Sequence, residues 1–372
     1  MSQSITFTSI YTADTMGVCS ALFELGGMCV MDDASGCNST YNTHDEPRWY
    51  DTDSLVFITA LTENEALMGE DGKTVSDIVS AAERLRPRFI ALAGTPIPAM
   101  CGTDIPALGR VIEKRSGIPA FGIQTDGMHS YLSGCSKAFA ALAERAVAET
   151  GKRRPRSVNI LGLTPLDFSV GGMAESAAEA VKAAGFEVVS SWAMGSSFDD
   201  IARSGEAAAD LVVSETGLAA ARALERRFGI PYVVGAPFGR FAGKVFGALE
   251  KGETADLTAG HGSGDTVIIG ERVTSASLAA AIEAESGISV RVLCPLESEL
   301  SGGGDRIMEE SEIARALEGA KTVVADPLYR PLLPEGARLV ELPHEAFSGR
   351  IFRSRIPDLV KNTSIIINEV LS

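Results

Sequence analysis

The sequence predicts an α/β protein whose strands form parallel sheets, and three observations carry this prediction. Apolar runs such as Leu55–Ile58 and Ala120–Ile123 are short and continuous rather than alternating, which is typical of strands buried on both faces of a sheet. Amphipathic stretches with helical spacing separate these runs almost from end to end. The alternation restarts after two breaks, so we expect three doubly wound, Rossmann-like units.

The first unit is expected to span residues 1–151, including an N-terminal segment. An apolar run before residue 31 leads into a polar loop, and strands and helices alternate from there. Thr103 or Asp104 has a side chain that commonly caps a helix N-terminus, which predicts a helix directly after it. In chain order, the predicted elements are strand 55–58, helix 73–86, strand 89–93, helix 104–116, strand 120–123 and helix 129–149.

Two breaks divide the rest of the chain. Residues 151–156 are basic and contain a proline, and we interpret them as a solvated linker before a second unit at residues 152–261. Residues 258–264 are rich in glycine and adjoin a third unit at residues 262–372. The strands predicted in these two units are residues 158–163, 187–190, 211–214, 232–234, 266–269, 290–293, 322–325 and 339–342, with helices near 173–184 and up to 227.

The charge and apolar content of the chain limit its partners and its environment. The 372 residues include 33 Lys and Arg against 49 Asp and Glu, for a formal net charge of −16. An acidic surface repels phosphate backbones, so nucleic acid is not an expected partner. The sequence shows no secretory signal and no apolar run of membrane-spanning length. We therefore expect a cytoplasmic protein whose six cysteines are thiols or metal ligands rather than disulfides.

Several motifs of nucleotide and metal chemistry are absent. No Gly-x-Gly-x-x-Gly motif follows a strand, no Cys-x-x-Cys pair exists, and no Gly-x-Ser-x-Gly elbow is present. Residues 239–245 approach a P-loop, but their spacing is short and Val245 stands where a hydroxyl would bind Mg²⁺. The chain is therefore not expected to hydrolyse a nucleotide itself.

The most unusual segment is the loop at residues 31–50. It concentrates a thiol, an imidazole, four carboxylates, an arginine and three aromatic rings. Gly36 leaves the backbone open beside Cys37, and backbone N–H groups near a thiolate stabilise its charge and tune a cluster bound to it. The simpler alternative is a polar surface loop with Trp49 and Tyr50 packed on the core. We favour a functional site, because polar loops of this density commonly carry one.

Two further loops follow strands of the same unit. One contains Thr95, Cys101 and two prolines, and the prolines are expected to make it a stiff loop. The other carries His129. Loops that leave the carboxyl ends of parallel strands share one edge of the sheet, so all three could face one crevice. Alternatively, Asp104 and Asp126 are only helix caps.

The order of these motifs resembles the subunits of nitrogenase component 1. The Gly36-Cys37 loop, the Thr-Pro-Ile-Pro and Gly-Thr-Asp-Ile motifs and the strand–helix pair after them follow the order of that family. The resemblance covers nearly the whole chain and lies in the sequence of motifs across three domains. It implies an α/β fold of three Rossmann-like, doubly wound parallel-sheet domains. The segments that resemble the second and third domains are residues 158–162, 211–214, 225–231 and 270–273.

The resemblance also implies a cofactor. In that family a comparable glycine–cysteine pair ligates an iron–sulfur cluster at a subunit interface, and Cys37 falls at that place. We therefore expect an iron–sulfur cluster of the [4Fe–4S] type with Cys37 as a metal ligand. The family's other ligand positions fall near Ile10 and at about Thr95, neither of which is a cysteine. Ser214 stands where a nitrogenase α subunit has its cofactor-binding cysteine, so neither a molybdenum–iron cofactor nor nitrogen fixation is expected.

The cysteine count then implies a second subunit. A [4Fe–4S] cluster needs four ligands, usually thiolates. A homodimer doubles every ligand, so two cysteines per chain would complete the set, and a related subunit in a heteromer would do the same. Cys19 and Cys29 are expected first of all to be core residues, whereas Cys101 is expected to lie in a loop. The residues expected to bind the cofactor are Gly36, Cys37, Thr95 and Cys101.

In the resembled systems a separate ATP-hydrolysing iron–sulfur reductase docks and passes electrons one at a time. We therefore expect a nitrogenase-like oxidoreductase subunit that reduces an unidentified small molecule. The alternatives are a non-redox small-molecule-binding protein and a scaffold for cluster or cofactor assembly, while a nucleotide-sugar transferase would leave the cysteine loop unexplained. Histidine suits proton delivery near neutral pH. The residues expected to position the substrate or deliver protons are His44, Asp45, Arg48 and His129.

Overall fold

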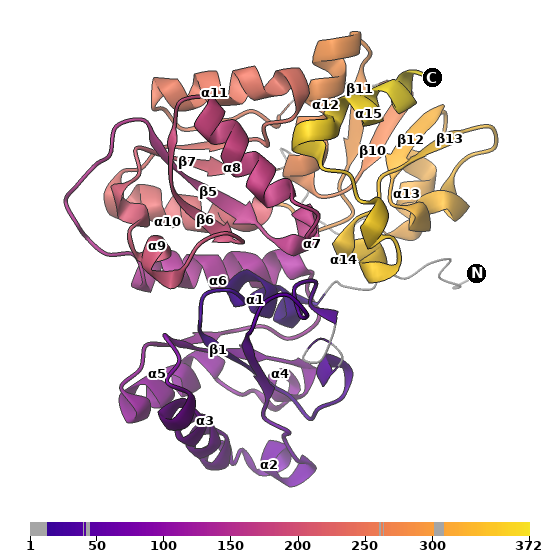
Figure 1. The fold of residues 1–372 in the computed structure, drawn as a ribbon. Helices are drawn as coiled ribbons and strands as arrows, with labels where there is room; N and C mark the ends of the chain where they lie inside the picture. The colour runs from indigo at the N-terminus through magenta and orange to yellow at the C-terminus, as the bar shows by residue number, and fades with distance from the viewer. Residues whose placement is uncertain (1–12, 40, 42–44, 260–261, 263, 301–308) are drawn as a thin grey trace.

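Three parallel sheets, each wrapped by helices, make up the protein (Figure 1). The computed structural model describes residues 13–39, 41, 45–259, 262, 264–300 and 309–372, and the side chain of Cys37 lies outside this description. The strand orders of the sheets are β2-β1-β3-β4, β6-β5-β7-β8-β9 and β11-β10-β12-β13, and every paired strand runs parallel to its neighbour. The expected α/β class with three parallel-sheet domains is confirmed.

The first sheet is buried on both faces, as its continuous apolar strands predict. Alternate strand residues face opposite layers: Met28 and Val30 pack with one helix pair, and Cys29 and Met31 with the other. The first pair is α3 and α5, and the second is α1 and α6. The elements of this domain are α1 (Asp14–Leu22), β1 (Met28–Asp32), β2 (Leu55–Ile58), α2 (Glu63–Met68), α3 (Asp71–Leu85), β3 (Ile90–Gly94), α4 (Pro96–Cys101), α5 (Ile105–Ser116), β4 (Ala120–Ile123) and α6 (Tyr131–Arg145).

The short helix α4 corrects the sequence prediction for this region. The two prolines indicated a stiff loop, but the chain forms a helix that begins at Pro96. Proline is tolerated at the first turn of a helix, because its fixed φ suits the helix and its missing N–H is not needed there. The helix ends at Gly102, which adopts the left-handed conformation that glycine favours. Asp104 caps α5 through the N–H of Ala107, as the simpler alternative for that residue predicted.

The second and third domains repeat the strand–helix pattern. Most observed strands begin or end within two residues of the predicted runs; β6 runs on to Ala193. The elements of the second domain are β5 (Ser157–Leu163), α7 (Pro165–Phe168), α8 (Met173–Ala183), β6 (Glu187–Ala193), α9 (Phe198–Ala202), β7 (Ala209–Val212), η4 (Glu215–Gly217), α10 (Leu218–Phe228), β8 (Tyr232–Val234), α11 (Ala242–Lys251) and β9 (Ala255–Asp256). Those of the third are β10 (Thr266–Ile269), α12 (Arg272–Ser286), β11 (Val290–Leu293), α13 (Glu310–Ala316), β12 (Thr322–Ala325), β13 (Arg338–Glu341), α14 (Glu345–Ser348) and α15 (Leu359–Leu371).

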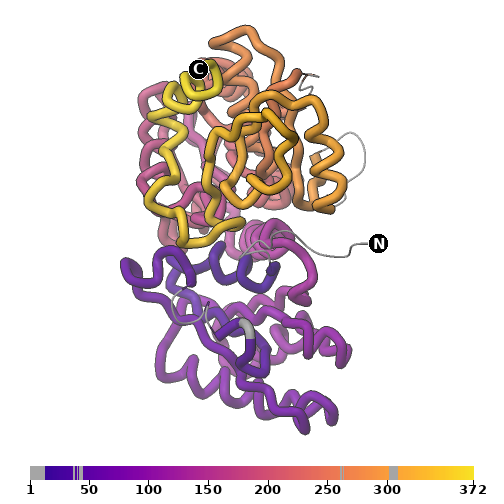
Figure 2. The backbone as a smooth tube through the Cα atoms, turned by 90° about the vertical axis from the view of Figure 1, so that its right-hand side faces the viewer, coloured from indigo at the N-terminus to yellow at the C-terminus, as the bar shows by residue number. Residues whose placement is uncertain are grey.

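Two helices join the domains across the gaps between sheets. Helix α6 packs on α1 in the first domain and on α10 and η4 in the second, and it lies between the first sheet and the upper part of the molecule (Figures 1 and 2). The C-terminal helix α15 packs on α12 of its own domain and on α8 of the second. The boundaries proposed at residues 151/152 and 261/262 lie between the sheets, but these helices tie the units together. The exact boundaries stay predictions.

Glycines let α1 and α6 approach backbone to backbone. A Cβ on Gly134 would lie 1.8 Å from the carbonyl oxygen of Asp14, and one on Gly17 would lie 2.3 Å from that of Tyr131. The thiol of Cys135 donates to the carbonyl of Gly17 at 3.1 Å. This contact positions α1, and α1 in turn places Asp14 and Thr15 at the edge of the first sheet. No helix in the described part of the chain is long and apolar enough to cross a membrane.

Candidate functional site

The carboxyl ends of β1, β3 and β4 form one edge of the first sheet, called the carboxyl edge here. Hydrogen bonds tie the chain segments together at this edge: Thr95 Oγ1 donates to the carbonyl of Asp32 at 2.6 Å. The hydroxyls of Thr15 and Thr125 both donate to the carbonyl of Gly94, at 2.7 and 2.8 Å. The predicted loops after these three strands therefore do start side by side, and α1 joins them.

The predicted cofactor residues have different environments at the carboxyl edge. Thr95 is fully buried and its hydroxyl is used within the protein, so it supports the loop rather than offering a ligand. Cys101 is exposed at the end of α4. Gly36 is exposed with open space around it, and the backbone of Cys37 begins a short 3-10 helix, Cys37–Ser39. His44 lies outside the described residues.

The remaining described cysteines are poor candidates for metal ligands. Cys19, Cys29 and Cys135 are buried in the core, as expected for the first two. A hydrogen bond with Cys29 and burial raise the pKa of Cys19, while burial raises the pKa of Cys135. Burial likewise raises the pKa of Cys294. Iron binds the thiolate form of cysteine, and the raised pKa values keep Cys19, Cys135 and Cys294 in the inert thiol form.

Arg48 holds the loop 45–50 to the rest of the protein. Its guanidinium donates to Glu46 at 2.6 and 2.9 Å, to Glu24 at 3.0 Å and to the carbonyl of Ser20 at 2.7 Å. It also lies 5.0 Å from the ring centre of Phe23. The side chain is 4% exposed. This geometry favours an anchoring role for Arg48 over the substrate-positioning role that the sequence suggested.

Asp14, Asp126 and His129 form a group that the sequence did not reveal. Each offers one ligand atom, and these atoms lie within 4.8 Å of one another, the one such group of three among the described residues. His129 Nδ1 is 3.0 Å from Asp126 Oδ1, and this hydrogen bond raises the pKa of His129. Asp14 is buried and accepts backbone N–H groups of Thr15, Asp126 and Gly127. Its oxygens are therefore already used, whereas His129 is half exposed.

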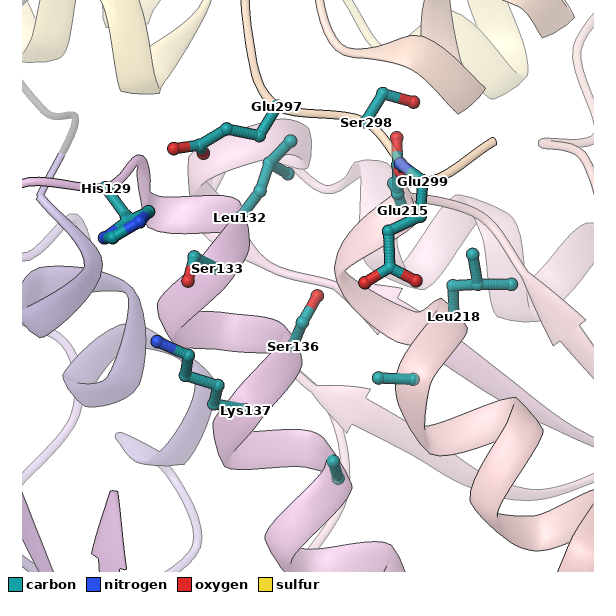
Figure 3. Close-up of a pocket in the computed structure, with 12 residues that line it drawn as sticks. His129, Leu132, Ser133, Ser136, Lys137, Glu215, Leu218, Glu297, Ser298 and Glu299 are labelled. Carbon is teal, nitrogen blue, oxygen red and sulfur yellow. The ribbon is translucent and has the colours of Figure 1, made fainter. Parts of the chain in front are cut away.

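An open pocket of about 320 Å³ lies where the three domains meet (Figure 3). One side is α6 and the turn before it, the opposite side is η4 with α10, and the segment after β11 closes the top of the view. Among the predicted site residues whose side chains the structure describes, only His129 reaches it. The lining residues are His129, Leu132, Ser133, Ser136, Lys137, Ala140, Glu215, Leu218, Ala219, Glu297, Ser298 and Glu299.

A buried polar cluster centred on Asp167 lies between the same domains. Its carboxylate accepts hydrogen bonds from Ser214 Oγ at 2.6 Å and from the Tyr131 hydroxyl. His344 Nε2 lies 3.5 Å from Asp167 Oδ1. Glu271 adjoins the cluster, and burial together with the charge of Asp167 raises its pKa to about 8. The hydroxyl of Ser214 is thus committed inside the protein.

Asp45 completes the set of predicted residues. It is partly buried, and its carboxylate lies 4.0 Å from Arg350 Nη1 of the third domain. The structure therefore brings His129 to the pocket, leaves Gly36 and Cys101 at the carboxyl edge, and gives Thr95 and Arg48 supporting contacts. Asp14 was missed, because its contacts with the backbone of Asp126 and Gly127 join residues 112 and 113 positions apart.

Comparison with known proteins adds the family. The family described as nitrogenase component 1 type oxidoreductase matches residues 14–246. The nitrogenase iron-molybdenum cofactor biosynthesis protein NifE of Clostridium pasteurianum is 26% identical over 179 residues, which cover 48% of this chain and 38% of that protein. NifE of Sinorhizobium fredii (strain NBRC 101917 / NGR234) is 29% identical over 188 residues, covering 49% and 37%.

Two further comparisons extend this result. A light-independent protochlorophyllide reductase subunit of Prosthecochloris aestuarii (strain DSM 271 / SK 413) is 27% identical over 187 residues, covering 48% of this chain and 34% of that protein. The chain thus spans well under half the length of these curated relatives. The solved structure titled "Nitrogenase Cp1 at pH 5" superposes with a TM-score of 0.65 at 15% identity, over 98% of this chain and 88% of that one, which shows the shared fold. Because the family match covers more than half of its residues, the chain belongs to the nitrogenase component 1 type oxidoreductase family.

Proposed function

We propose that the chain is a redox subunit that holds an iron–sulfur cluster through Cys37 at an interface with a second subunit. The observation that carries the proposal is the position of the Gly36-Cys37 turn, directly after β1 at the carboxyl edge of the first sheet, in a member of this family. Apart from its chain neighbours, Gly36 has no described atom within 4 Å of its Cβ position, which supports a backbone open to a bulky group. When bound, the cluster would supply one-electron transfer.

The ligand set argues for an interface. Four thiolates are needed for a [4Fe–4S] cluster, and one chain offers at most Cys37 and the exposed Cys101, because the other described cysteines are buried or favour the thiol. A second copy would double this pair, and a related subunit would supply the rest. The residues therefore fit half of a ligand set, so a cluster requires a partner.

Electrons and protons would come from different sources. The sequence has no P-loop, so the proposed electron donor is a separate ATP-hydrolysing iron–sulfur reductase. The pKa of His129 is raised by Asp126, so its imidazole keeps a proton closer to neutral pH and suits proton delivery to a small-molecule substrate. His44 and Asp45 stay proposed substrate-positioning residues.

A scaffold for cofactor assembly is the second candidate. It is favoured by the similarity to NifE, whose name describes cofactor biosynthesis. A redox subunit would accept electrons from a reductant and return to its starting spectrum when substrate is added. A scaffold would instead transfer its metal to an acceptor protein and end without it. Following iron and spectrum together during turnover separates the two candidates.

The test of the cluster proposal is anaerobic reconstitution with iron and sulfide, followed by iron counting and electron paramagnetic resonance. Cys37→Ser keeps the side-chain size but supplies a harder, poorer ligand for iron, so iron content should fall sharply while the fold survives. The matched control is Cys294→Ser, whose hydroxyl can replace the thiol as a donor to the carbonyl of Leu296 and which should leave the iron unchanged. Full iron and an unchanged spectrum in Cys37→Ser would exclude Cys37 as a ligand.

A further inference from the structure

The two edges of the first sheet differ in their protection. At one edge, two long cations cover the backbone of β4: Arg145 Nη1 donates to the carbonyl of Ala120 at 2.7 Å, and Lys137 Nζ donates to that of Gln124 at 2.8 Å. Natural proteins commonly protect sheet edges with charged side chains, prolines or bulges. At the other edge, β2 reads Leu-Val-Phe-Ile, without a charge or a proline, and its register with β1 has no bulge. None of these three devices is therefore present within β2.

The backbone of β2 offers hydrogen-bonding groups at this edge. Just after the strand, the N–H of Thr59 donates to the carbonyl of Met31 in β1 at 3.1 Å. Successive residues of a strand turn their backbone groups to opposite sides, so Val56 and Ile58 turn theirs outward, away from β1. Within the described sheet β2 pairs only with β1, so these outward N–H and C=O groups have no strand partner there.

An apolar groove of about 180 Å³ lies beside this edge, between β2 and α3. Its lining includes Val30 of β1, Phe57 of β2, and Ile78 and Ala81 of α3. Val30 and Phe57 are register partners, so they share the face of the sheet that α3 covers. Phe57 is nevertheless 38% exposed. A strand added beside β2 would place alternate side chains at this groove, which is large enough for one aliphatic side chain.

The chain around β2 is acidic. Asp51 and Asp53 precede the strand and Glu63 follows it, and all three are exposed. Asp77 borders the groove with its side chain 66% exposed, and its carboxylate lies 3.5 Å from the ammonium of Lys73. These carboxylates attract a basic partner. The β2 strand of a second copy would bring the same acidic flanks and be repelled.

We propose that the outer edge of β2 and the groove beside it bind an extended segment of a partner protein, apolar at its centre and basic at both ends. The backbone of this segment adds a strand to the sheet through the outward groups of Val56 and Ile58. One of its aliphatic side chains enters the groove, and its basic residues face the carboxylates that flank β2. Backbone pairing supplies affinity, while the groove and the charges supply selectivity.

Isothermal titration calorimetry on the full chain tests this with the peptide acetyl-Lys-Thr-Val-Leu-Val-Thr-Lys-amide, which should bind. The same peptide with glutamate at both ends should bind at least about tenfold more weakly, because like charges then meet. A third peptide has proline in place of the central leucine. It loses both a backbone donor and the side chain for the groove, so its binding should also fall at least about tenfold.

Variants of the chain locate the site. Phe57→Lys places on β2 the kind of charge that protects natural edges, and it should weaken the basic peptide at least about tenfold. The matched control is Leu85→Lys, a residue of similar exposure (43%) in the last turn of α3 and outside the groove, which should bind like the unaltered chain. Ala81→Leu fills the groove with a strong helix former, and it keeps the test decisive if Phe57→Lys is poorly folded.

Absence of binding by the basic peptide, equal binding of the basic and acidic peptides, or full binding by both groove variants would each overturn the proposal. A dimer that forms without peptide and that Phe57→Lys dissociates would assign the edge to a second copy, which also overturns it. None of these measurements involves iron, and the groove lining does not include Gly36 or Cys101. A failure here therefore leaves the cluster proposal standing, and a failure of Cys37 as a ligand leaves this one standing.

Discussion

Replacing Arg48 by methionine should destabilise the first domain strongly. Methionine fills similar space but leaves the carboxylate of Glu46, whose side chain is fully buried, without the guanidinium that neutralises it. Removing one partner of a buried ion pair costs about 3–5 kcal/mol. At roughly 2–4 °C per kcal/mol for a domain of this size, the melting temperature should fall by roughly 6–20 °C. Thermal unfolding followed by circular dichroism measures this shift.

Two further variants separate the buried charge from lost packing. Arg350→Met removes an exposed arginine whose ion pair with Asp45 is 4.0 Å long, so stability should change by less than about 0.5 kcal/mol. Combining Arg48→Met with Glu46→Leu removes both buried charges and should recover much of the loss. Glu24 tolerates this change, because it is partly exposed and also accepts the N–H of Gly195.

The reasoning is refuted if Arg48→Met melts like Arg350→Met, or if the double variant is less stable than Arg48→Met alone. A stable Arg48→Met protein that binds its cluster but has lost activity would instead restore the substrate-positioning role. The measurement therefore decides between an anchor and a catalytic residue.

Two other predictions concern pH and helix contact. The pKa of Glu271 is about 8 in the folded protein against 4.5 ordinarily, so unfolding between these pH values releases a proton. The free energy of unfolding should therefore fall by up to about 1.4 kcal/mol per pH unit as pH rises from 5 to 8. Urea denaturation of Glu271→Gln should show a weaker dependence of stability on pH, and an equal slope in the variant would contradict the assignment. Gly134→Ala should lower the free energy of unfolding by about 3 kcal/mol or more, because its Cβ would overlap the carbonyl of Asp14. Gly72→Ala, in open space on α3, should be neutral or slightly stabilising. Similar effects of the two substitutions would contradict the close contact of α1 and α6.

The strands could be predicted from the sequence because their signal is local. A continuous apolar run such as Tyr232–Val234 predicts a strand buried on both faces, and this prediction needs no information about residues distant in the sequence. Helix α4 was missed because proline was interpreted as a breaker, although Pro96 occupies the first turn, where it is allowed.

The site could be predicted only in part, because its polar groups are assigned by distant contacts. Arg48 had the appearance of a functional residue in a polar loop, yet its partners include Ser20 in α1. Glu215 gave no signal, since the segment that buries it and donates to its carboxyl lies after β11, far away in the sequence. Periodicity carries no information about such pairings.

The glycine contact between α1 and α6 has a consequence for how the chain is made. Helix α1 is almost wholly buried and largely apolar, and it leaves the ribosome before its partner α6, because the hydrogen bond from Cys135 to Gly17 joins residues 118 positions apart. At roughly 5–20 residues per second, α1 waits about 6–24 s for its partner to be synthesised. During that interval the apolar surface of α1 is exposed to other nascent chains, so a chaperone that shields α1 during synthesis should raise the yield of folded protein more than one that acts after release.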